Sequence, residues 1–199
     1  DNSNPNRIRE GNQDLRPNYV HSFNIMFNKW DAMSGKYIWS GINGTVTDDA
    51  FATSTNYDQY GRTISKTVNV DGNTNASAFA GAGFPFFGRK LTLQPGGSAF
   101  FNRFSSFVND EKNTTDNLGL GGGLEVRVQL DSLEITVSNR YDYNRPTSTL
   151  SSQANDPFSS QRYQARVLWR MPKGFTIESE LDYTLNSQRA DGYNINFLV

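Results

Sequence analysis

Apolar and polar side chains alternate along much of this chain with a period of two residues. The clearest segment is residues 175–185, where apolar side chains share one face and mostly acidic residues and threonines share the other. Residues 133–143 repeat the pattern. Successive side chains of a β-strand point to opposite faces, so each segment is predicted to be a half-buried strand. Helical periodicity is nearly absent, and the sequence therefore predicts an all-β protein.

The links between the predicted strands alternate in length. About eight strands are expected, with a ninth beginning at Tyr193, and they start near Val20, Lys36, Asn73, Lys90, Thr115, Leu133, Gln161 and Phe175. Short links are predicted at residues 31–35, 85–89, 131–132 and 172–174, and long links at residues 49–72, 106–115, 144–160 and 186–192. Transmembrane β-barrels have this asymmetry, with short periplasmic turns and longer extracellular loops. We therefore predict an antiparallel up-and-down meander of eight or nine strands from a partial transmembrane β-barrel.

Composition agrees with strands better than with membrane helices. Of the 199 residues, 36% are hydrophobic and 13% aromatic, and the mean hydropathy is −0.63. No run approaches the roughly 18 apolar residues of a membrane helix, but a membrane strand needs an apolar residue only at every second position. Residues 1–6 lack the features of a signal peptide, and residues 194–199 resemble an interrupted strand. We expect residues 1–199 to be one barrel segment, without a plug domain, cut from a longer chain.

Several functional classes have little support in the sequence. The net charge is −1 and no basic run stands out, so nucleic acid is not an expected partner. Cysteine is absent, and His21 is the single histidine, which leaves a catalytic triad or a multi-histidine metal site without most of its parts. Glu178 and Glu180 share a strand face, whereas glycoside hydrolysis needs two carboxyl groups across a cleft. We expect no enzymatic activity, no cofactor and no metal.

Two local motifs have simpler alternatives. Residues 119–123 read Gly-Leu-Gly-Gly-Gly, but the Gly-Lys-Ser/Thr ending of a phosphate-binding loop is missing, and close packing or strand curvature is the better interpretation. Residues 71–75 and 109–117 are rich in oxygen ligands, which would permit calcium in loops. They do not follow the spaced EF-hand pattern, and turn chemistry explains them as well.

Charged side chains share the polar faces of the last predicted strands. A hairpin at residues 172–174 would place three arginines of one strand opposite three acidic residues of the next, which stabilises a sheet modestly. The predicted lumen-facing charge network consists of Glu125, Arg127, Glu134, Arg140, Asp142, Arg162, Arg166, Arg170, Glu178, Glu180 and Asp182. Its functional interpretation is a lumen surface that steers a substrate or docks a plug. The alternative is a solvated wall whose charges compensate one another.

The membrane hypothesis also predicts where apolar side chains point. Outward-facing positions are expected at Ile135, Val137, Tyr141, Val167, Trp169, Ile177, Leu181 and Tyr183. Aromatic residues near the short links would form a membrane-interface girdle, namely Trp30, Tyr37, Trp39, Phe84, Phe86, Phe87, Trp169 and Phe175. The alternative is the core of a soluble sandwich.

Residues 11–17, Gly-Asn-Gln-Asp-Leu-Arg-Pro, resemble the Gly-Asn-x-x-Leu-Lys/Arg-Pro signature in barrels of TonB-dependent outer-membrane receptors. More narrowly, the chain is similar to the Bacteroidetes-type barrels related to them. The motif residues are Gly11, Asn12, Leu15, Arg16 and Pro17. The resemblance implies a barrel of about 22 strands, of which this chain would form somewhat under half. It also implies outer-membrane lipid, the remaining barrel, a plug domain, TonB and a nutrient ligand as partners; no plug or TonB-contact segment is found here.

The leading hypothesis is a barrel in the bacterial outer membrane that takes up an unidentified nutrient with energy from TonB. Residues 49–72 and 144–160 would face the ligand first, because extracellular loops meet it first. The alternative is a soluble or surface-exposed β-sheet module that binds or adheres without transport.

Overall fold

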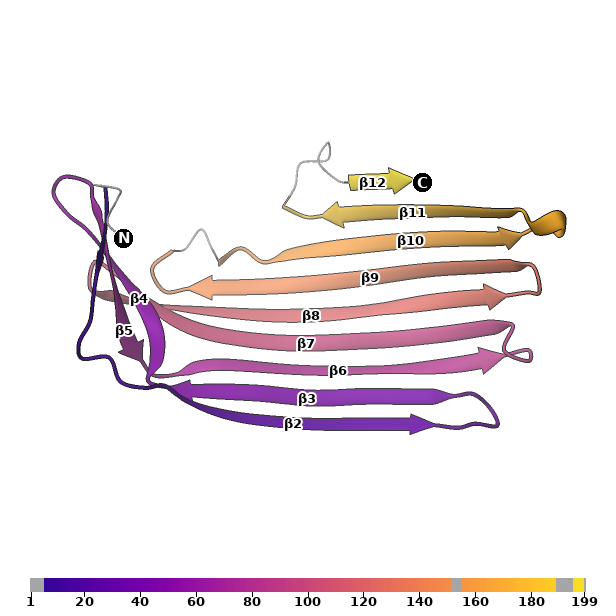
Figure 1. The fold of residues 1–199 in the computed structure, drawn as a ribbon, viewed down its shortest axis with the longest axis horizontal. Coiled ribbons are helices and arrows are strands. Elements are labelled where there is room, and N and C mark those ends of the chain that lie inside the picture. Colours follow the sequence, from indigo (N-terminus) through magenta and orange to yellow (C-terminus); the bar gives the residue numbers. More distant parts are fainter. Residues whose placement is uncertain (1–5, 152–154, 189–194, 199) are drawn as a thin grey trace.

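The computed structural model describes residues 6–151, 155–188 and 195–198, and these form one sheet of 12 strands (Figure 1). The strands are β1 (Arg7–Glu10), β2 (Tyr19–Trp30), β3 (Tyr37–Asp48), β4 (Ala50–Tyr57), β5 (Thr63–Val70), β6 (Asn73–Phe86), β7 (Leu91–Val108), β8 (Glu111–Gln129), β9 (Leu133–Ser148), β10 (Phe158–Arg170), β11 (Thr176–Asn186) and β12 (Ile195–Leu198). Apart from one short 3-10 turn, η2 (Pro172–Gly174), and a single 3-10 residue at Asn155, no helix occurs in these ranges. The predicted all-β class is confirmed.

Nine of the strands form a single antiparallel wall, β2-β3-β6-β7-β8-β9-β10-β11-β12. We call these strands the wall. Eight of them are the predicted meander, and β12 is the predicted ninth strand. Each strand pairs with the next along the chain, except that β3 passes over the hairpin β4–β5 to pair with β6.

Tight turns join the wall strands at one end, which lies to the right in Figure 1. They fall at the four predicted short links. In the turn between β10 and β11, Lys173 and Gly174 have φ of 68° and 82°, and the Met171 N–H donates to the Phe175 carbonyl at 2.8 Å. The short-link predictions are therefore confirmed.

The opposite end differs from the sequence-based expectation in two places. Residues 106–115 are not a long link, because β7 and β8 continue to a tight turn at Asn109 and Asp110, whose φ values are 49° and 63°. Residues 49–72 are not an open loop but the hairpin β4–β5. The alternating segments of this hairpin are short, and the buried residues Ala50 and Ala52 have small side chains. The pattern therefore does not stand out in the sequence.

The hairpin β4–β5 packs at this end with β1 and the outer ends of β7 and β8, a region that we call the outer module. Strand β4 pairs in parallel with β7 through Ser54 and Thr55, and β1 pairs in parallel with β5. Ala50, Ala52 and Val70 are buried there, and Val68 and Phe107 pack against them. These three are the buried hydrophobic residues of the part of the chain that the structure describes.

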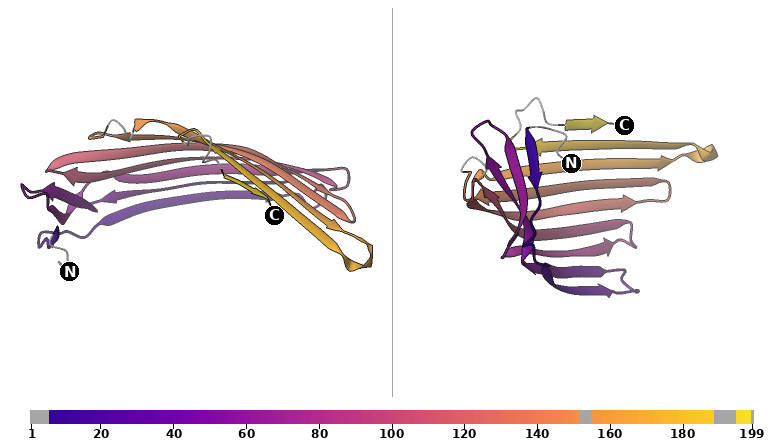
Figure 2. Two further views of the ribbon diagram at one scale, coloured as in Figure 1. Left: turned by 90° about the horizontal axis from the view of Figure 1, so that it is seen from above. Right: turned by 60° about the vertical axis from the view of Figure 1, so that its left-hand side comes forward.

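The wall is bowed, and its two ends bend toward the same side (Figure 2). Within the described residues it does not close, because β2 pairs only with β3 and the far end of the sheet is β12. An open, curved sheet is what a section of a larger barrel would form.

The pairing registers connect the two faces of the wall from strand to strand. Val126 lies opposite Val137, Val137 opposite Ala165, and Ala165 opposite Leu181. Side chains of directly paired residues project on the same side of a sheet. One face, called the apolar face, therefore carries Ile25, Ile42, Ala78, Ala99, Leu120, Leu124, Val126, Ile135, Val137, Tyr141, Val167, Trp169, Ile177, Leu181 and Tyr183.

The apolar face is the more open of the two. Along β8, Leu118 and Leu120 of this face are exposed, whereas Gly119 and Gly121, which alternate with them, are buried and half-buried. A hollow on the opposite, polar face is lined by residues from β3 to β10. The polar face is therefore the concave one, and all eight residues predicted to point outward lie on the convex side.

Candidate functional site: the concave polar face

All eleven residues of the predicted charge network lie on the concave face, as the registers from β8 to β11 require. Arg127 pairs with Glu125 at 2.9 Å and Arg140 with Asp142 at 2.8 Å, each within one strand. We call the part of the concave face that carries these eleven residues, on β8 to β11, the charged half. The interpretation of this face as a barrel lumen stays a prediction.

Two further pairs cross the β10–β11 hairpin. Arg166 Nε donates to Glu178 at 2.8 Å, and Arg162 lies 3.7 Å from Asp182. Gln164 Nε2 also donates to Asp182, at 2.9 Å. Glu134, Arg170 and Glu180 share the face but take part in none of the four ion pairs. Positive and negative groups are interleaved, so the charged half carries no strong field of one sign.

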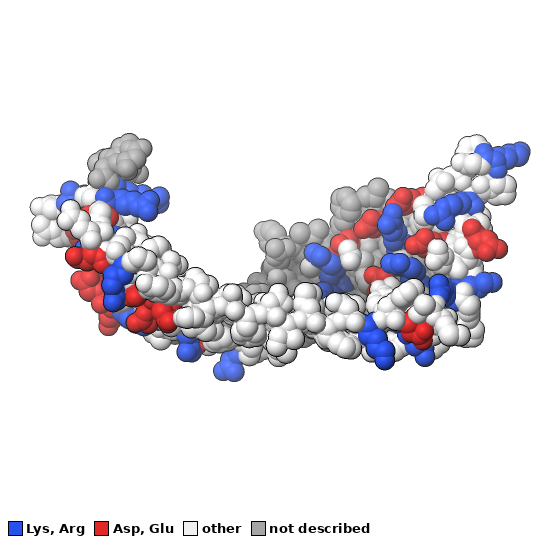
Figure 3. Space-filling view, turned by 60° about the horizontal axis from the view of Figure 1, so that its bottom comes forward, with Lys and Arg blue, Asp and Glu red and all other residues white. Residues whose placement is uncertain are grey.

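The concave face of β3, β6 and β7, together with that of β8 from Asn113 to Gly121, carries no charge, and we call it the neutral half. Its polar residues include Asn43, Thr45, Thr47, Asn73, Asn75, Ser77, Asn102 and Asn117. Figure 3 shows charged side chains gathered toward both ends of the molecule, with a largely uncharged stretch between them. Sequence reasoning missed this half, although Asn, Ser and Thr recur at every second position in residues 43–47 and 73–77.

Four residues of the neutral half form a continuous row across four strands. Thr45 is paired with Asn75, Asn75 with Asn102, and Asn102 with Asn117. The Asn75 amide donates to the Asn102 carbonyl oxygen, and nearby Ser77 donates to Asn43. Asn117 Oδ1 is buried and has no hydrogen-bond partner among the described residues. A buried acceptor without a donor is unusual and calls for an explanation.

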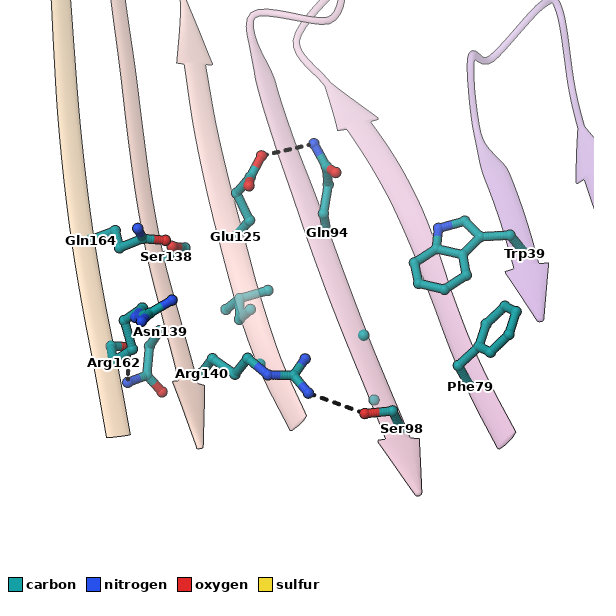
Figure 4. Close-up of a pocket in the computed structure, with 14 residues that line it drawn as sticks. Trp39, Phe79, Gln94, Ser98, Glu125, Ser138, Asn139, Arg140, Arg162 and Gln164 are labelled. Carbon is teal, nitrogen blue, oxygen red and sulfur yellow. Dashed lines mark hydrogen bonds between the residues drawn. The ribbon is translucent and has the colours of Figure 1, made fainter. Parts of the chain in front are cut away.

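A groove of about 320 Å³ lies where the neutral and charged halves meet (Figure 4). We call it the central groove. Trp39 and Phe79 form one flank, with ring centroids 5.7 Å apart. Arg140 and Arg162 form the other, and Gly96 contributes bare backbone to the floor between them. The groove therefore offers an aromatic side, a polar side and a floor without side chains.

Aromatic rings on the concave face cover glycines of the neighbouring strand. A Cβ at Gly81 would overlap the Trp39 ring, and a Cβ at Gly83 would overlap the ring of Tyr37. Trp30, Tyr37 and Trp39 lie on the concave face by register. The girdle prediction is therefore wrong for these three residues, because a ring that faces the concave side does not meet lipid. The aromatic type of a residue and its closeness to a turn did not show on which face of the sheet it lies. Its position along the alternating strand did.

Close packing also explains three of the four glycines in residues 119–123. A Cβ at Gly119 would overlap Phe100, one at Gly121 would overlap Asp142 and Arg140, and one at Gly123 would meet the Asn139 carbonyl. The interpretation as close packing is confirmed.

The motif of residues 11–17 lies in the outer module. Asn12 donates to the Thr67 carbonyl at 2.9 Å, and the Arg16 guanidinium lies 2.5 Å from Asp49. The Asn69 side chain accepts from the Arg16 N–H at 2.8 Å and donates to the Arg16 carbonyl at 2.9 Å, and also to the Asp49 carbonyl at 2.6 Å. This part of the motif therefore attaches the N-terminal segment to the hairpin β4–β5, a role that the sequence did not predict.

The other three motif residues make no such side-chain hydrogen bonds. Gly11 has open space around its Cα, Leu15 is half-buried and Pro17 is exposed. Pro17 precedes β2, where its fixed φ and missing N–H suit a segment that leads into a strand.

The titration behaviour of two turn carboxylates follows from local hydrogen bonds. The Arg62 N–H, the Arg62 side chain and the Tyr60 N–H donate to Asp58 and lower its pKa below the usual 3.8. Ser34 and the Met33 N–H do the same for the pKa of Asp31. Both are turn-stabilising carboxylates rather than reactive groups.

The described residues hold no cluster of three or more histidine, cysteine, aspartate or glutamate side chains that could bind a metal ion. His21 lies 3.5 Å from Asp48 at the edge of the wall. No helix in the described ranges is long and apolar enough to cross a membrane.

Comparison with known proteins agrees with this architecture. A sequence model of an outer membrane protein beta-barrel family matches residues 1–166. No curated protein and no solved structure matches the chain. The bowed meander, its exposed apolar face and this match lead to one conclusion: the chain belongs to the outer membrane protein beta-barrel family and resides in the lipid environment of the bacterial outer membrane.

Proposed function

We propose that this chain forms part of the wall of a receptor that takes up a nutrient too large for porins, with energy from TonB and without chemical change of the nutrient. A plug domain and the remaining barrel wall would complete the receptor. The concave face would line the path, and the outer module would meet the ligand first. Residues 1–199 would act as one segment of that barrel.

The observation that carries the proposal is the placement of the receptor-like motif. Asn12 and Arg16 bind the hairpin β4–β5 at the end of the wall opposite the tight turns. In outer-membrane barrels the short turns are periplasmic and the longer connections extracellular. Four short turns lie at the other end of the wall and one, at Asn109 and Asp110, at this end, so we take this end as the extracellular one. The motif that resembles the signature of TonB-dependent receptors would thus hold a structured extracellular element at the rim of the wall.

The concave face supports the same proposal. Its charges form balanced pairs, and its outer part consists of amides and hydroxyls. Such a surface can contact a polar ligand or a plug through hydrogen bonds without holding ions of one sign.

Medium depletion tests the proposal. Cells that carry or lack the protein, each with and without TonB, would be grown in one complex medium, and mass spectrometry would record which compounds disappear. We expect a compound that is removed only when both the protein and TonB are present. If the compound is still removed without TonB, TonB is not the energy source. If all four strains deplete the medium equally, the protein does not take up the compound.

A second candidate is a surface-binding module without transport. Tyr57 and Tyr60 are exposed at the tip of the hairpin β4–β5, and the Arg62 guanidinium lies 5.4 Å from the Tyr60 ring centroid. Exposed tyrosines and arginines are common in binding surfaces. This candidate predicts that a ligand is retained on the cell surface equally with and without TonB, and that Tyr60→Ala lowers the retention.

A further inference from the structure

Most glycines of the concave face are explained by packing, but Gly96 is not. A Cβ added at Gly96 would make only ordinary van der Waals contacts, the nearest with the Ala80 carbonyl oxygen 3.6 Å away. Glycine inside a strand is destabilising by roughly 0.5–1 kcal/mol relative to alanine. A glycine that the wall itself does not need marks a place where a ligand or another backbone approaches closely.

Trp39 forms a flat platform beside this opening. Its ring lies over Gly81, so the indole is parallel to the sheet, and 39% of the residue remains exposed. One face of the indole covers the sheet, and the other is available to the groove (Figure 4). A flat, exposed indole binds apolar faces of ring-shaped ligands, whether aromatic or saturated.

The polar partners around the platform are mostly already paired. Arg140 donates to Ser98 at 3.1 Å and pairs with Asp142, and Gln94 donates to Glu125 at 3.3 Å. Because each nearby arginine has an acidic partner, the groove does not select an ion of either sign. Its serine and amide groups remain able to donate to and accept from hydroxyl groups.

The amide row extends this chemistry toward the extracellular rim. Thr45, Asn75 and Asn102 lie side by side across the strands, and the buried Asn117 Oδ1 lacks a donor. A hollow of about 360 Å³ lies over them, and we call this hollow and the central groove together the lane. The charged residues in its lining, Arg103, Glu125, Arg140 and Arg162, each have an oppositely charged partner. The length of the lane suits a ligand longer than one ring.

We propose that this lane binds an uncharged oligosaccharide, with one sugar ring stacked on Trp39 above Gly96 and further hydroxyls on the amide row. The proposal rests on the uptake function proposed above and names the class of its ligand. An uncharged sugar matches the three properties of the lane: a flat ring face, hydrogen-bond donors and acceptors, and charged groups that are already paired with one another.

Gly96→Val and Gly122→Val provide a matched pair of variants. A Cβ at either glycine would make only ordinary van der Waals contacts, and each has a φ that valine can adopt. They lie on neighbouring strands, but Gly96 faces the groove and Gly122 the convex side. Valine favours strands, so each variant should fold. Only Gly96→Val places methyl groups in the lane.

Calorimetry on the full-length protein in detergent micelles tests the proposal, with maltohexaose, cellohexaose and xylohexaose as probes and hexagalacturonate as the charged control. We expect one neutral probe to bind, Gly96→Val and Trp39→Ala to weaken it at least about tenfold, equivalent to about 1.4 kcal/mol, and Gly122→Val to leave it within about twofold. The charged hexamer should bind more weakly than its neutral counterpart.

Three outcomes would overturn the proposal: no neutral probe binds, the charged hexamer binds as well as the neutral ones, or the two valine variants bind alike. A groove filled by a polypeptide such as a plug would show no sugar binding, and Gly96→Val would instead lower resistance to protease. Binding in micelles needs no TonB. Sugar binding with TonB-independent depletion would therefore contradict only the proposed function, and TonB-dependent depletion without sugar binding only this inference.

Discussion

The wall and the outer module consist of the same kind of strand, yet different surroundings stabilise them. In the outer module Ala50, Ala52 and Val70 are buried against one another, as in a water-soluble protein. In the wall, apolar residues such as Val137 and Leu181 remain 49% and 42% exposed. Exposed side chains at regular spacing gain stability only if lipid replaces water around them. One chain thus joins a part that requires the membrane to a part that packs in water.

The largest expected effect tests the lipid contact of the wall. Val137→Arg places a charge on the apolar face, where arginine at the bilayer midplane is unfavourable by roughly 2–4 kcal/mol. We expect strongly reduced assembly, measured as the amount of folded protein in isolated outer membranes. Leu181→Arg should behave in the same way.

The adjacent variant Thr136→Arg is the matched control, because Thr136 is paired with Arg127 and Arg166 on the concave face. It should assemble normally, as should Glu178→Gln. Equal assembly of all four variants would mean that the apolar face does not contact lipid, and the contrast between wall and outer module would be lost.

A second prediction concerns the aromatic packing that replaces a core in the wall. Gly81→Ala places a methyl group where the Trp39 ring lies, and overpacking of this kind costs about 1–3 kcal/mol. We expect the folded band on unheated gels to be lost at a lower temperature than for the unmodified protein. Gly96→Ala, whose added methyl group would make only ordinary van der Waals contacts, should leave that temperature unchanged or raise it. A similar loss for both variants would argue against ring-over-glycine packing.

A third prediction addresses the outer module alone. Asn69→Ala removes three hydrogen bonds that hold Arg16 and Asp49, and we expect a local loss of about 1–2 kcal/mol. Proteolysis should then cut residues 49–72 faster while membrane assembly stays normal. Reduced assembly of Asn69→Ala would show that the wall depends on the outer module, contrary to the separation drawn above.

The smallest expected effect is the response of the hairpin tip to acid. The pKa of Asp58 is lowered, chiefly by the Arg62 N–H, so its stabilisation is fully present above the usual value of 3.8 and is lost as the pH falls through the lowered pKa. Hydrogen exchange at Tyr60 and Arg62, corrected for intrinsic rates, should accelerate in that range. Asp58→Asn should remove the pH dependence, and amides in the middle of the wall should not respond.

The sequence alone determined the wall. Period-two alternation in residues 133–143 and 175–185 identified the strands and their two faces, because strand parity depends only on local geometry. The short turns followed from glycine, proline and aspartate at the ends of those strands. For the same reason the charged residues of β8 to β11 could be assigned to one face before any pairing was known.

Only the tertiary structure showed the features that depend on contacts between residues far apart in the sequence. The hairpin β4–β5 and its small core depend on contacts among Ala52, Val70 and Phe107, and the sequence offers no strong alternation there. The attachment of Arg16 to Asn69 joins residues 53 positions apart. The central groove needs Trp39, Gly96 and Arg140 on three separate strands, and their meeting depends on the register of every strand between them. Local periodicity fixes which way a side chain points, but not which side chains of other strands it meets.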